Sequence, residues 1–206
     1  MSNDALKQMA LDYHRNPVAG MLSILPKGTL FLCDTHVTPN PTMEEIPEMI
    51  LLGAETVRRF GKTRRVALLS HSNFGTADKE SAIKMRKAVA VLKETAPELE
   101  VEGEMHADAA IDPAVRERIF PNSKMKGRAN LLILPNLEAA NNAFNLLKSI
   151  GDGLPVGPIF VGAGAPAHIL TPSVTARGIV NMSALAVVDA QSCLRAAQYE
   201  LLETQS

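Results

Sequence analysis

The segment from Asn130 to Asn145, NLLILPNLEAANNAFN, decides the fold. An apolar run of the kind found in buried strands ends at Pro135. Asn136 then stands where a helix N-cap is expected, because its side chain can accept from the free N–H groups of the first turn. Apolar residues recur behind it at helical spacing, at Leu137, Ala140, Phe144 and Leu147. A strand that leads into a helix N-terminus can hold an anionic ligand.

The same alternation of strand and helix continues along most of the chain. Strands are predicted at 29–34, 66–70, 99–104, 129–134 and 158–161. Helices are predicted from the Thr42–Glu45 capping box to about residue 60, at 81–94, after the Asp112–Pro113 pair, after Asn136, and over 25–30 residues from about Ser173. This order predicts an α/β layered fold with a mostly parallel sheet. Ligands bind such sheets at the carboxyl ends of the strands, which selects the loops 70–75, 135–138 and 162–175.

Residues 1–28 do not follow this alternation. Prolines at 17 and 26 interrupt them, and the first residues are polar and helix-forming. We therefore expect an arm outside the core. The apolar face of the last helix carries Ile179, Met182, Ala186, Ala190, Cys193, Ala197 and Leu201, and is expected to be buried.

Composition excludes several classes of protein. The 206 residues are 46% hydrophobic and 21% charged, as in an ordinary globular protein, and the net charge of -1 gives no case for binding nucleic acid or an anionic membrane. Cys33 and Cys193 lie in apolar stretches and are predicted to be buried free thiols. The N-terminus has no apolar run of signal-peptide length, and no run reaches the length of a membrane span, so we expect a cytoplasmic protein.

The loop Ser70–Gly75, SHSNFG, allows two interpretations. Its hydroxyls, amide and N–H groups could hold a phosphate or acyl group, or its own side chains could cap the strand end. A nucleophilic Ser70–His71 pair is disfavoured, because adjacent residues of an extended chain point to opposite faces.

Two further motifs suggest chemistry only weakly. Asp34 with His36, and His106 with Asp108, place an acid and an imidazole two residues apart, but no ligand set with zinc-like spacing accompanies them. We predict no metal site. The segment 162–166, GAGAP, imitates a dinucleotide fingerprint, but Pro166 prevents an immediate helix, so a loop beside a ligand is expected instead.

Several motifs, taken in order, carry a resemblance to a known family. They are CDTHVTPNPT at 33–42, EGEMHADAA at 102–110, PNLEAAN at 135–141, GPI at 157–159, APAHILT at 165–171 and IVNM at 179–182. From Gly28 to Glu203 the chain resembles phosphate acetyltransferase. Its variants LSHSNFG and HILTPS are more similar to the phosphate acetyltransferase-like C-terminal domain of large NADP-dependent malic enzymes.

The resemblance implies a domain organisation. Residues 1–20 resemble the N-terminal arm of the same malic enzymes, and residues 21–206 the transferase-like domain, with the malate- and NADP-binding domains missing between them. The implied fold is α/β, three-layered and isocitrate/isopropylmalate-dehydrogenase-like, with a partial first lobe, a second lobe and coenzyme A between them. NADP and a divalent metal would belong to the missing domains.

The resemblance also implies a loss of chemistry. The family's catalytic Ser, Arg and Asp fall at Thr171, Pro172 and Gly178, so the guanidinium and the base are gone. The implied function is a regulatory domain that binds acetyl-coenzyme A as an effector, without a catalytic cofactor, in a homodimer or higher homo-oligomer. Two alternatives remain, an active transacetylase that relies on Thr171 and a domain that only oligomerises. The expected ligand contacts are Ser70, Asn73, Asn136, Glu138, Asn141, His168, Thr171 and Ser173.

Overall fold

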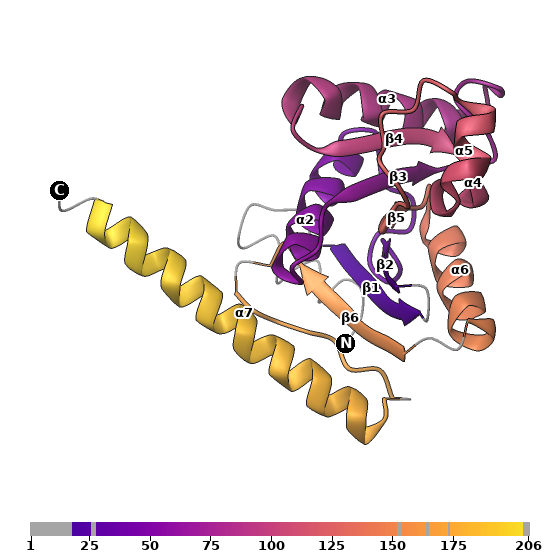
Figure 1. The fold of residues 1–206 in the computed structure, drawn as a ribbon. Helices are drawn as coiled ribbons and strands as arrows, with labels where there is room; N and C mark the ends of the chain where they lie inside the picture. The colour runs from indigo at the N-terminus through magenta and orange to yellow at the C-terminus, as the bar shows by residue number, and fades with distance from the viewer. Residues whose placement is uncertain (1–17, 26–27, 152–153, 164, 173, 204–206) are drawn as a thin grey trace.

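Six strands form one sheet in the order β4-β3-β5-β2-β1-β6 (Figure 1). The computed structural model describes residues 18–25, 28–151, 154–163, 165–172 and 174–203, with the backbone alone for 18–25 and 196–203. The strands are β1 (Val18–Leu25), β2 (Gly28–Cys33), β3 (Arg65–Leu69), β4 (Glu100–Met105), β5 (Leu131–Ile133) and β6 (Leu154–Val161). Only β1 runs against its neighbours; β2, β3, β4 and β5 pair in parallel, and β6 opposes β1 and so points the same way. The predicted mostly parallel sheet is confirmed.

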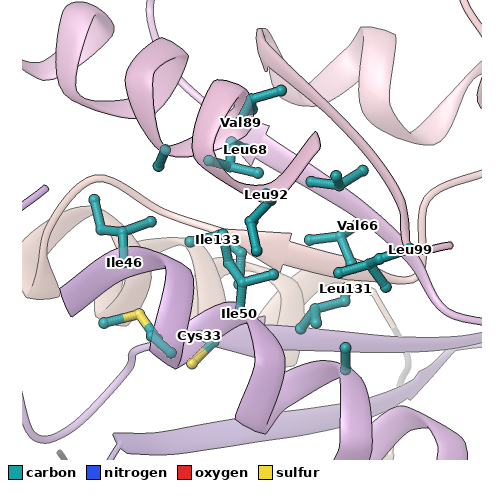
Figure 2. Packing of buried hydrophobic residues seen from close by; sticks show 14 of the residues in the cluster. Cys33, Ile46, Ile50, Val66, Leu68, Val89, Leu92, Leu99, Leu131 and Ile133 are labelled. Carbon is teal, nitrogen blue, oxygen red and sulfur yellow. The ribbon is translucent and has the colours of Figure 1, made fainter. Parts of the chain in front are cut away.

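Helices cover both faces of this sheet. They are α2 (Glu45–Arg59), α3 (Glu80–Thr95), α4 (Ala107–Ile111), α5 (Pro113–Ile119), α6 (Leu137–Ile150) and α7 (Ala176–Glu203). Residues of α2 and α3 share one hydrophobic cluster, part of which Figure 2 shows, and residues of α4, α5 and α6 pack in the other. The result is a helix–sheet–helix arrangement. The described residues form a single sheet, so the expected pair of lobes is not seen among them.

Strand β3 shows why the apolar runs are buried on both sides. Val66 and Leu68 belong to the cluster under α2 and α3, whereas Ala67 and Leu69 belong to the opposite one. Successive side chains of a strand point to opposite faces, so a strand covered twice needs an unbroken apolar sequence. Burying each leucine contributes roughly 1.5–3 kcal/mol.

The predicted helix starts are confirmed by their hydrogen bonds. The Thr42 N–H donates to Glu45 Oε2 at 2.7 Å, and the Glu45 N–H donates to Thr42 Oγ1 at 3.2 Å, as a capping box requires. Asn136 Oδ1 accepts from the Ala139 N–H at 2.9 Å. Asp112 Oδ1 accepts from the Ala114 N–H at the same distance, ahead of Pro113.

The expected arm is corrected in part. Residues 18–25 form β1 inside the sheet, between β2 and β6. Leu25 pairs with Gly28, so β1 and β2 form a hairpin within the sheet. Residues 1–17, the rest of the predicted arm, lie outside the described residues. Helix α4 was not predicted from the sequence, because its five residues are too few to show a helical repeat of apolar residues.

Helix α7 differs most from its prediction. It begins and ends close to the expected residues, but its apolar face is largely uncovered, and it extends past β6 (Figure 1). Met182 is buried, whereas Ile179 is 43% exposed and Cys193 is exposed. Cys33 is buried as predicted; the prediction for Cys193 is wrong, because Cys193 borders an open cavity between α7 and the end of β6. Among the described residues, no helix is long and apolar enough to cross a membrane.

Candidate functional site

The carboxyl ends of the five parallel strands meet at one edge of the sheet, and adjacent loops are joined there by hydrogen bonds. The Leu137 N–H at the start of α6 donates to the Pro39 carbonyl in the loop after β2, at 3.0 Å. The His106 N–H after β4 donates to Asn73 Oδ1 after β3, at 2.7 Å. Five of the predicted site residues therefore fall into two groups along this edge, Ser70 with Asn73, and Asn136 with Glu138 and Asn141.

The loop after β3 is folded around one carboxylate. Glu104 is fully buried on β4, and its Oε1 accepts from the Ser72 hydroxyl at 2.7 Å and from the Gly75 N–H at 2.8 Å. The Arg86 guanidinium of α3 donates to both carboxylate oxygens, at 3.0 and 3.1 Å. Burial raises the pKa of Glu104, but the hydrogen bonds from Arg86 and Ser72 outweigh it, so the pKa is lowered.

Several donors of this loop are already engaged. The Ser72 N–H donates to Ser70 Oγ, the Phe74 N–H to the Glu104 carbonyl, and the Ala77 N–H to Ser72 Oγ. Phe74 has a φ of 48° in this arrangement and stacks on Phe120, with ring centroids 4.2 Å apart. In this structure the loop is capped by its own side chains, the second of the two interpretations. The His71 side chain stays exposed, and Ser70 is half-buried.

The second group of predicted residues surrounds the start of α6. Asn136 caps the helix, and Asn141 Nδ2 donates to the Thr35 carbonyl at 3.4 Å, while Glu138 is exposed. Beside them lies Lys84 of α3. Its Nζ donates to Asn40 Oδ1 at 2.9 Å and to the carbonyls of Pro41 and Pro135 at 2.9 and 3.0 Å. Burial lowers the pKa of Lys84, against the attraction of Glu80 and Glu45.

Asp34 organises the loop after β2. It is buried, and its carboxylate accepts from the N–H groups of His36, Val37 and Thr38 at 2.9, 3.1 and 2.7 Å. Burial nevertheless raises the pKa of Asp34. The His36 ring contacts Thr35 Oγ1 at 2.8 Å. Asp34 thus fixes the backbone of His36, and the His36 ring contacts Thr35.

The side chains of the other acid–imidazole pair, His106 and Asp108, also have different partners. His106 Nε2 lies 2.9 Å from the His71 carbonyl, whereas Asp108 accepts from the Ala109 N–H at 2.8 Å. Within the described residues, no group of three His, Cys, Asp or Glu is placed to hold a metal ion.

The loop after β6 is attached to α7 through His168. His168 Nε2 lies 3.0 Å from Asp189 Oδ2, and Asp189 Oδ1 lies 3.3 Å from Arg59 Nη1 of α2. Burial lowers the pKa of His168, although Asp189 acts in the opposite direction. The His168 side chain is 5% exposed and faces α7, which favours a role in placing the loop. The same loop borders a cavity of about 140 Å³ with Gly162 and Pro166.

The residues that the resemblance places at the family's catalytic positions lie at the junction of this loop with α7. Thr171 is half-buried and Pro172 exposed; Ser173 lies outside the described residues. Thr175 Oγ1 accepts from the Gly178 N–H at 3.1 Å and so caps the helix. A Cβ atom on Gly178 would lie 2.8 Å from Val174 Cγ2, closer than real Cβ contacts. A carboxylate at 178 would therefore require Val174 to move.

Sequence reasoning missed four residues that organise these loops: Lys84, Arg86, Glu104 and Asp189. Of these four, only Glu104 could have been noticed in the sequence, because it is a charged residue within a segment that pairs as a β strand. The other three reach their partners from helices. In the contacts described above these partners lie at least 18 residues away in sequence, which no local pattern reveals.

Comparisons with known proteins agree with this geometry. The model of the family described as phosphate acetyl/butaryl transferase matches residues 15–187. An NAD-dependent malic enzyme from Rhizobium meliloti is 53% identical over 168 residues, and an NADP-dependent malic enzyme from Escherichia coli is 52% identical over 170 residues. Each match covers 82% of this chain and 22% of the relative, so the chain spans about a fifth of their length.

Transferases are similar in structure. The EutD phosphotransacetylase from Staphylococcus aureus superimposes with a TM-score of 0.77 at 28% identity, over 85% of this chain and 53% of that one. Phosphate acetyltransferases also match in sequence, at lower identity than the malic enzymes. The expected resemblance to the transferase-like part of malic enzymes is confirmed.

Proposed function

Because this chain belongs to the phosphate acetyl/butaryl transferase family, we propose that it is a regulatory domain of a malic enzyme, which binds acetyl-coenzyme A and has lost the transferase reaction. The proposal rests on the expectation, taken from the resemblance, that Pro172 and Gly178 stand where the family has its Arg and Asp. Proline cannot stabilise negative charge, and the crowding of Val174 against position 178 is compatible with glycine. What remains is a binding surface without its acid–base groups.

The strand-end loops support binding of an anionic ligand. Lys84 places a positive charge beside the N-terminus of α6, and its three hydrogen-bond acceptors are uncharged oxygens. The helix dipole adds a positive potential at the same place. The phosphates of coenzyme A would lie over this part of the edge, close to Asn136, Glu138 and Asn141. His168 and Thr171 would approach the ligand from the loop after β6.

Calorimetric titration with acetyl-coenzyme A tests the binding. We expect saturable heat for the chain, and weaker binding for Lys84→Gln than for Lys87→Gln, an equally charged change at an exposed position of α3. If the chain gives no heat and no thermal shift with millimolar ligand, the regulatory function is wrong and the alternative of a purely oligomerising domain is favoured.

An active phosphate acetyltransferase is the second candidate, because the chain is similar in sequence to phosphate acetyltransferases and in structure to a phosphotransacetylase. In this alternative Thr171, at the family's serine position, would carry the reaction alone. We expect no interconversion of acetyl phosphate and acetyl-coenzyme A. Turnover at roughly 10 per second, an ordinary rate for an enzyme, would establish this alternative instead.

We also propose that the chain forms at least a dimer through α7. Val180, Val187 and Leu194 are 67%, 56% and 66% exposed and follow one another at seven-residue steps, so they form a single apolar stripe. Light scattering on the chain, and on a version without residues 1–17, tests this. A monomer in both cases contradicts the dimer, and a dimer lost with the shorter version assigns the interface to the first 17 residues.

A further inference from the structure

The loop after β6 is held from two sides. On one side, its Ala167 and Ile169 pack against the buried side chains of Val37 and Phe160. On the other side, the ring of His168 faces α7. The apolar contacts do not respond to pH, because none of these four side chains titrates. Among the described residues of the loop, His168 is the titratable side chain, so its contact is the one that a proton can alter.

The His168 ring occupies a place that suits its neutral form. Its side chain is 5% exposed, and both ring nitrogens are shielded from solvent. Nε2 lies 3.0 Å from Asp189 Oδ2, whereas Nδ1 has no hydrogen-bond partner among the described residues. A protonated ring carries an N–H on both nitrogens, and a buried charged donor without an acceptor is costly. Burial accordingly lowers the pKa of His168.

The charge of Asp189 offsets this cost only in part. Its second carboxylate oxygen, Oδ1, lies 3.3 Å from Arg59 Nη1 of α2. Arg59 in turn contacts Glu55 Oε1 at 3.3 Å, through its Nε. Asp189 therefore already faces a permanent positive charge, which reduces the gain from placing a second positive charge beside it.

Titratable groups also lie on the opposite side of the loop, after β2. Asp34 and His36 stand close to Val37, which packs against the loop. The Asp34 carboxylate accepts from the N–H groups of His36 and Val37. The His36 ring contacts Thr35 Oγ1. These side chains act within the loop after β2, and a variant of His36 can separate their titration from that of His168.

We propose that His168 and Asp189 form a proton-sensitive latch, which holds the loop after β6 against α7 near neutral pH and releases it in acid. Once the loop is released, the exposed histidine has its ordinary pKa of about 6.5. The docked ring binds a proton less readily than the released ring, so acidification below that value favours release. The loop also carries Thr171, so any effect on acetyl-coenzyme A rests on the proposed function, whereas the latch itself does not.

Proteolysis of the full chain by thermolysin, which cleaves before Ile and Leu, tests the latch. Cleavage before Ile169 or Leu170 reports the population of released loop. Its rate, divided by the rate for a free peptide of residues 165–172 at the same pH, should rise up to about tenfold from pH 7.5 to 5.5. Cleavage within the sheet, which reports global unfolding, should not rise in parallel.

Two histidine variants identify the titrating group. His168→Gln should abolish the rise in cleavage of the loop, whereas the matched control His36→Gln should leave it unchanged. No rise in the unaltered chain, or an equal rise in His168→Gln, would overturn the proposal.

Titration of the imidazole signals by NMR tests the latch on the unaltered chain. The His168 ring should titrate below about pH 6.5. Asp189→Asn should lower its pKa further, because the variant removes the charge that favours the protonated ring. Asp78→Asn, at a 79% exposed position, is the matched control and should leave it unchanged. A His168 ring that titrates at or above pH 6.5, or that does not respond to Asp189→Asn, would contradict the latch.

Calorimetry with acetyl-coenzyme A separates the latch from the proposed function. A chain that shows pH-dependent cleavage and binds no ligand at either pH keeps the latch and loses the proposed function. A chain that binds the ligand and shows no pH-dependent cleavage keeps the proposed function and loses the latch.

Discussion

The two ends of the sheet are built differently. At the β4 end, charged groups are buried and their partners come from the same region: Arg116 is 1% exposed and Glu104 is 0% exposed. At the β6 end, a cavity of about 400 Å³ separates α7 from the sheet, and the outer side of α7 is apolar and exposed. One end is complete by itself, whereas the other leaves apolar surface that a folded protein usually covers.

The difference indicates where each end obtains its stability. Arg116 donates to the carbonyls of Ala109, Met125 and Gly127, at 3.0, 3.0 and 2.6 Å, and to Ser123 Oγ. The segment it holds runs beside β4, where the Lys124 N–H donates to Glu102. The outer edge of β4 is therefore covered by the chain's own residues. The β6 end has no such arrangement among the described residues, and we expect a second copy of the chain to cover part of it.

The largest expected effect is at Arg116. Arg116→Met removes the donors of several buried carbonyls, and such groups are costly to leave unpaired, so the free energy of unfolding should fall by about 3–5 kcal/mol. Arg118→Met, an exposed change on the same helix, should cost less than about 0.5 kcal/mol. Urea unfolding measures both. Equal stability of the two variants would show that the β4 end does not depend on this buried network.

Met182 is the corresponding anchor at the β6 end. It is the α7 residue buried at 3% exposure, and Met182→Ala should lower the free energy of unfolding by about 2 kcal/mol, the small end of the range for methionine because the adjacent cavity allows relaxation. Limited proteolysis should then cut α7 before the sheet. Cleavage of α7 and of the sheet at the same rate would mean that the β4 end and the β6 end unfold as one unit.

Most of the sheet could be predicted from sequence because its signals are local. Apolar runs such as Val66–Leu69 and caps such as Asn136 act within a few residues. The exceptions depend on distant partners. Strand β1 is recognisable only once β2 and β6 are in place, and the exposure of Cys193 follows from the open cavity between α7 and the end of β6.

The candidate site was less predictable for the same reason. Strand-end loops could be chosen from the alternation of elements, but the groups that shape them come from elsewhere in the chain. Arg86 reaches Glu104 across 18 residues, and Lys84 reaches Pro135 across 51. The sequence therefore indicated which edge of the sheet to examine, and the packing of α3 determines how its loops are arranged.

Glu104 should give the β4 end a characteristic dependence on pH. Its pKa is lowered in the folded chain, so its contribution to stability is present above the pKa of a carboxyl group in the unfolded chain and is lost as the pH falls through the lower folded value. We expect Glu104→Gln to cost about 1–2 kcal/mol near pH 7, a moderate value because Arg86 is partly exposed to solvent. The difference in the free energy of unfolding between the unaltered chain and Glu104→Gln should shrink as the pH falls toward about 3.

Asp34 provides the contrast. Its pKa is raised, so the folded state favours the protonated form and gains stability as the pH falls. Asp34→Asn should therefore cost most at low pH and least at neutral pH, the reverse of Glu104→Gln. Chemical unfolding at several pH values measures both variants. If their costs change with pH in the same direction, the direction of the pKa shift is wrong for Glu104 or for Asp34.

The smallest effect on folding is expected on the outside of α7. Val187 is 56% exposed, so Val187→Asp should change the free energy of unfolding of the monomer by less than about 0.5 kcal/mol. It would nevertheless place a charge in the middle of the apolar stripe and should weaken self-association. Ile150→Asp, at a 78% exposed position on α6, is the matched control and should leave association unchanged. Sedimentation equilibrium separates the two effects, since it reports assembly and not folding. If both variants assemble like the unaltered chain, the exposed stripe is not an interface.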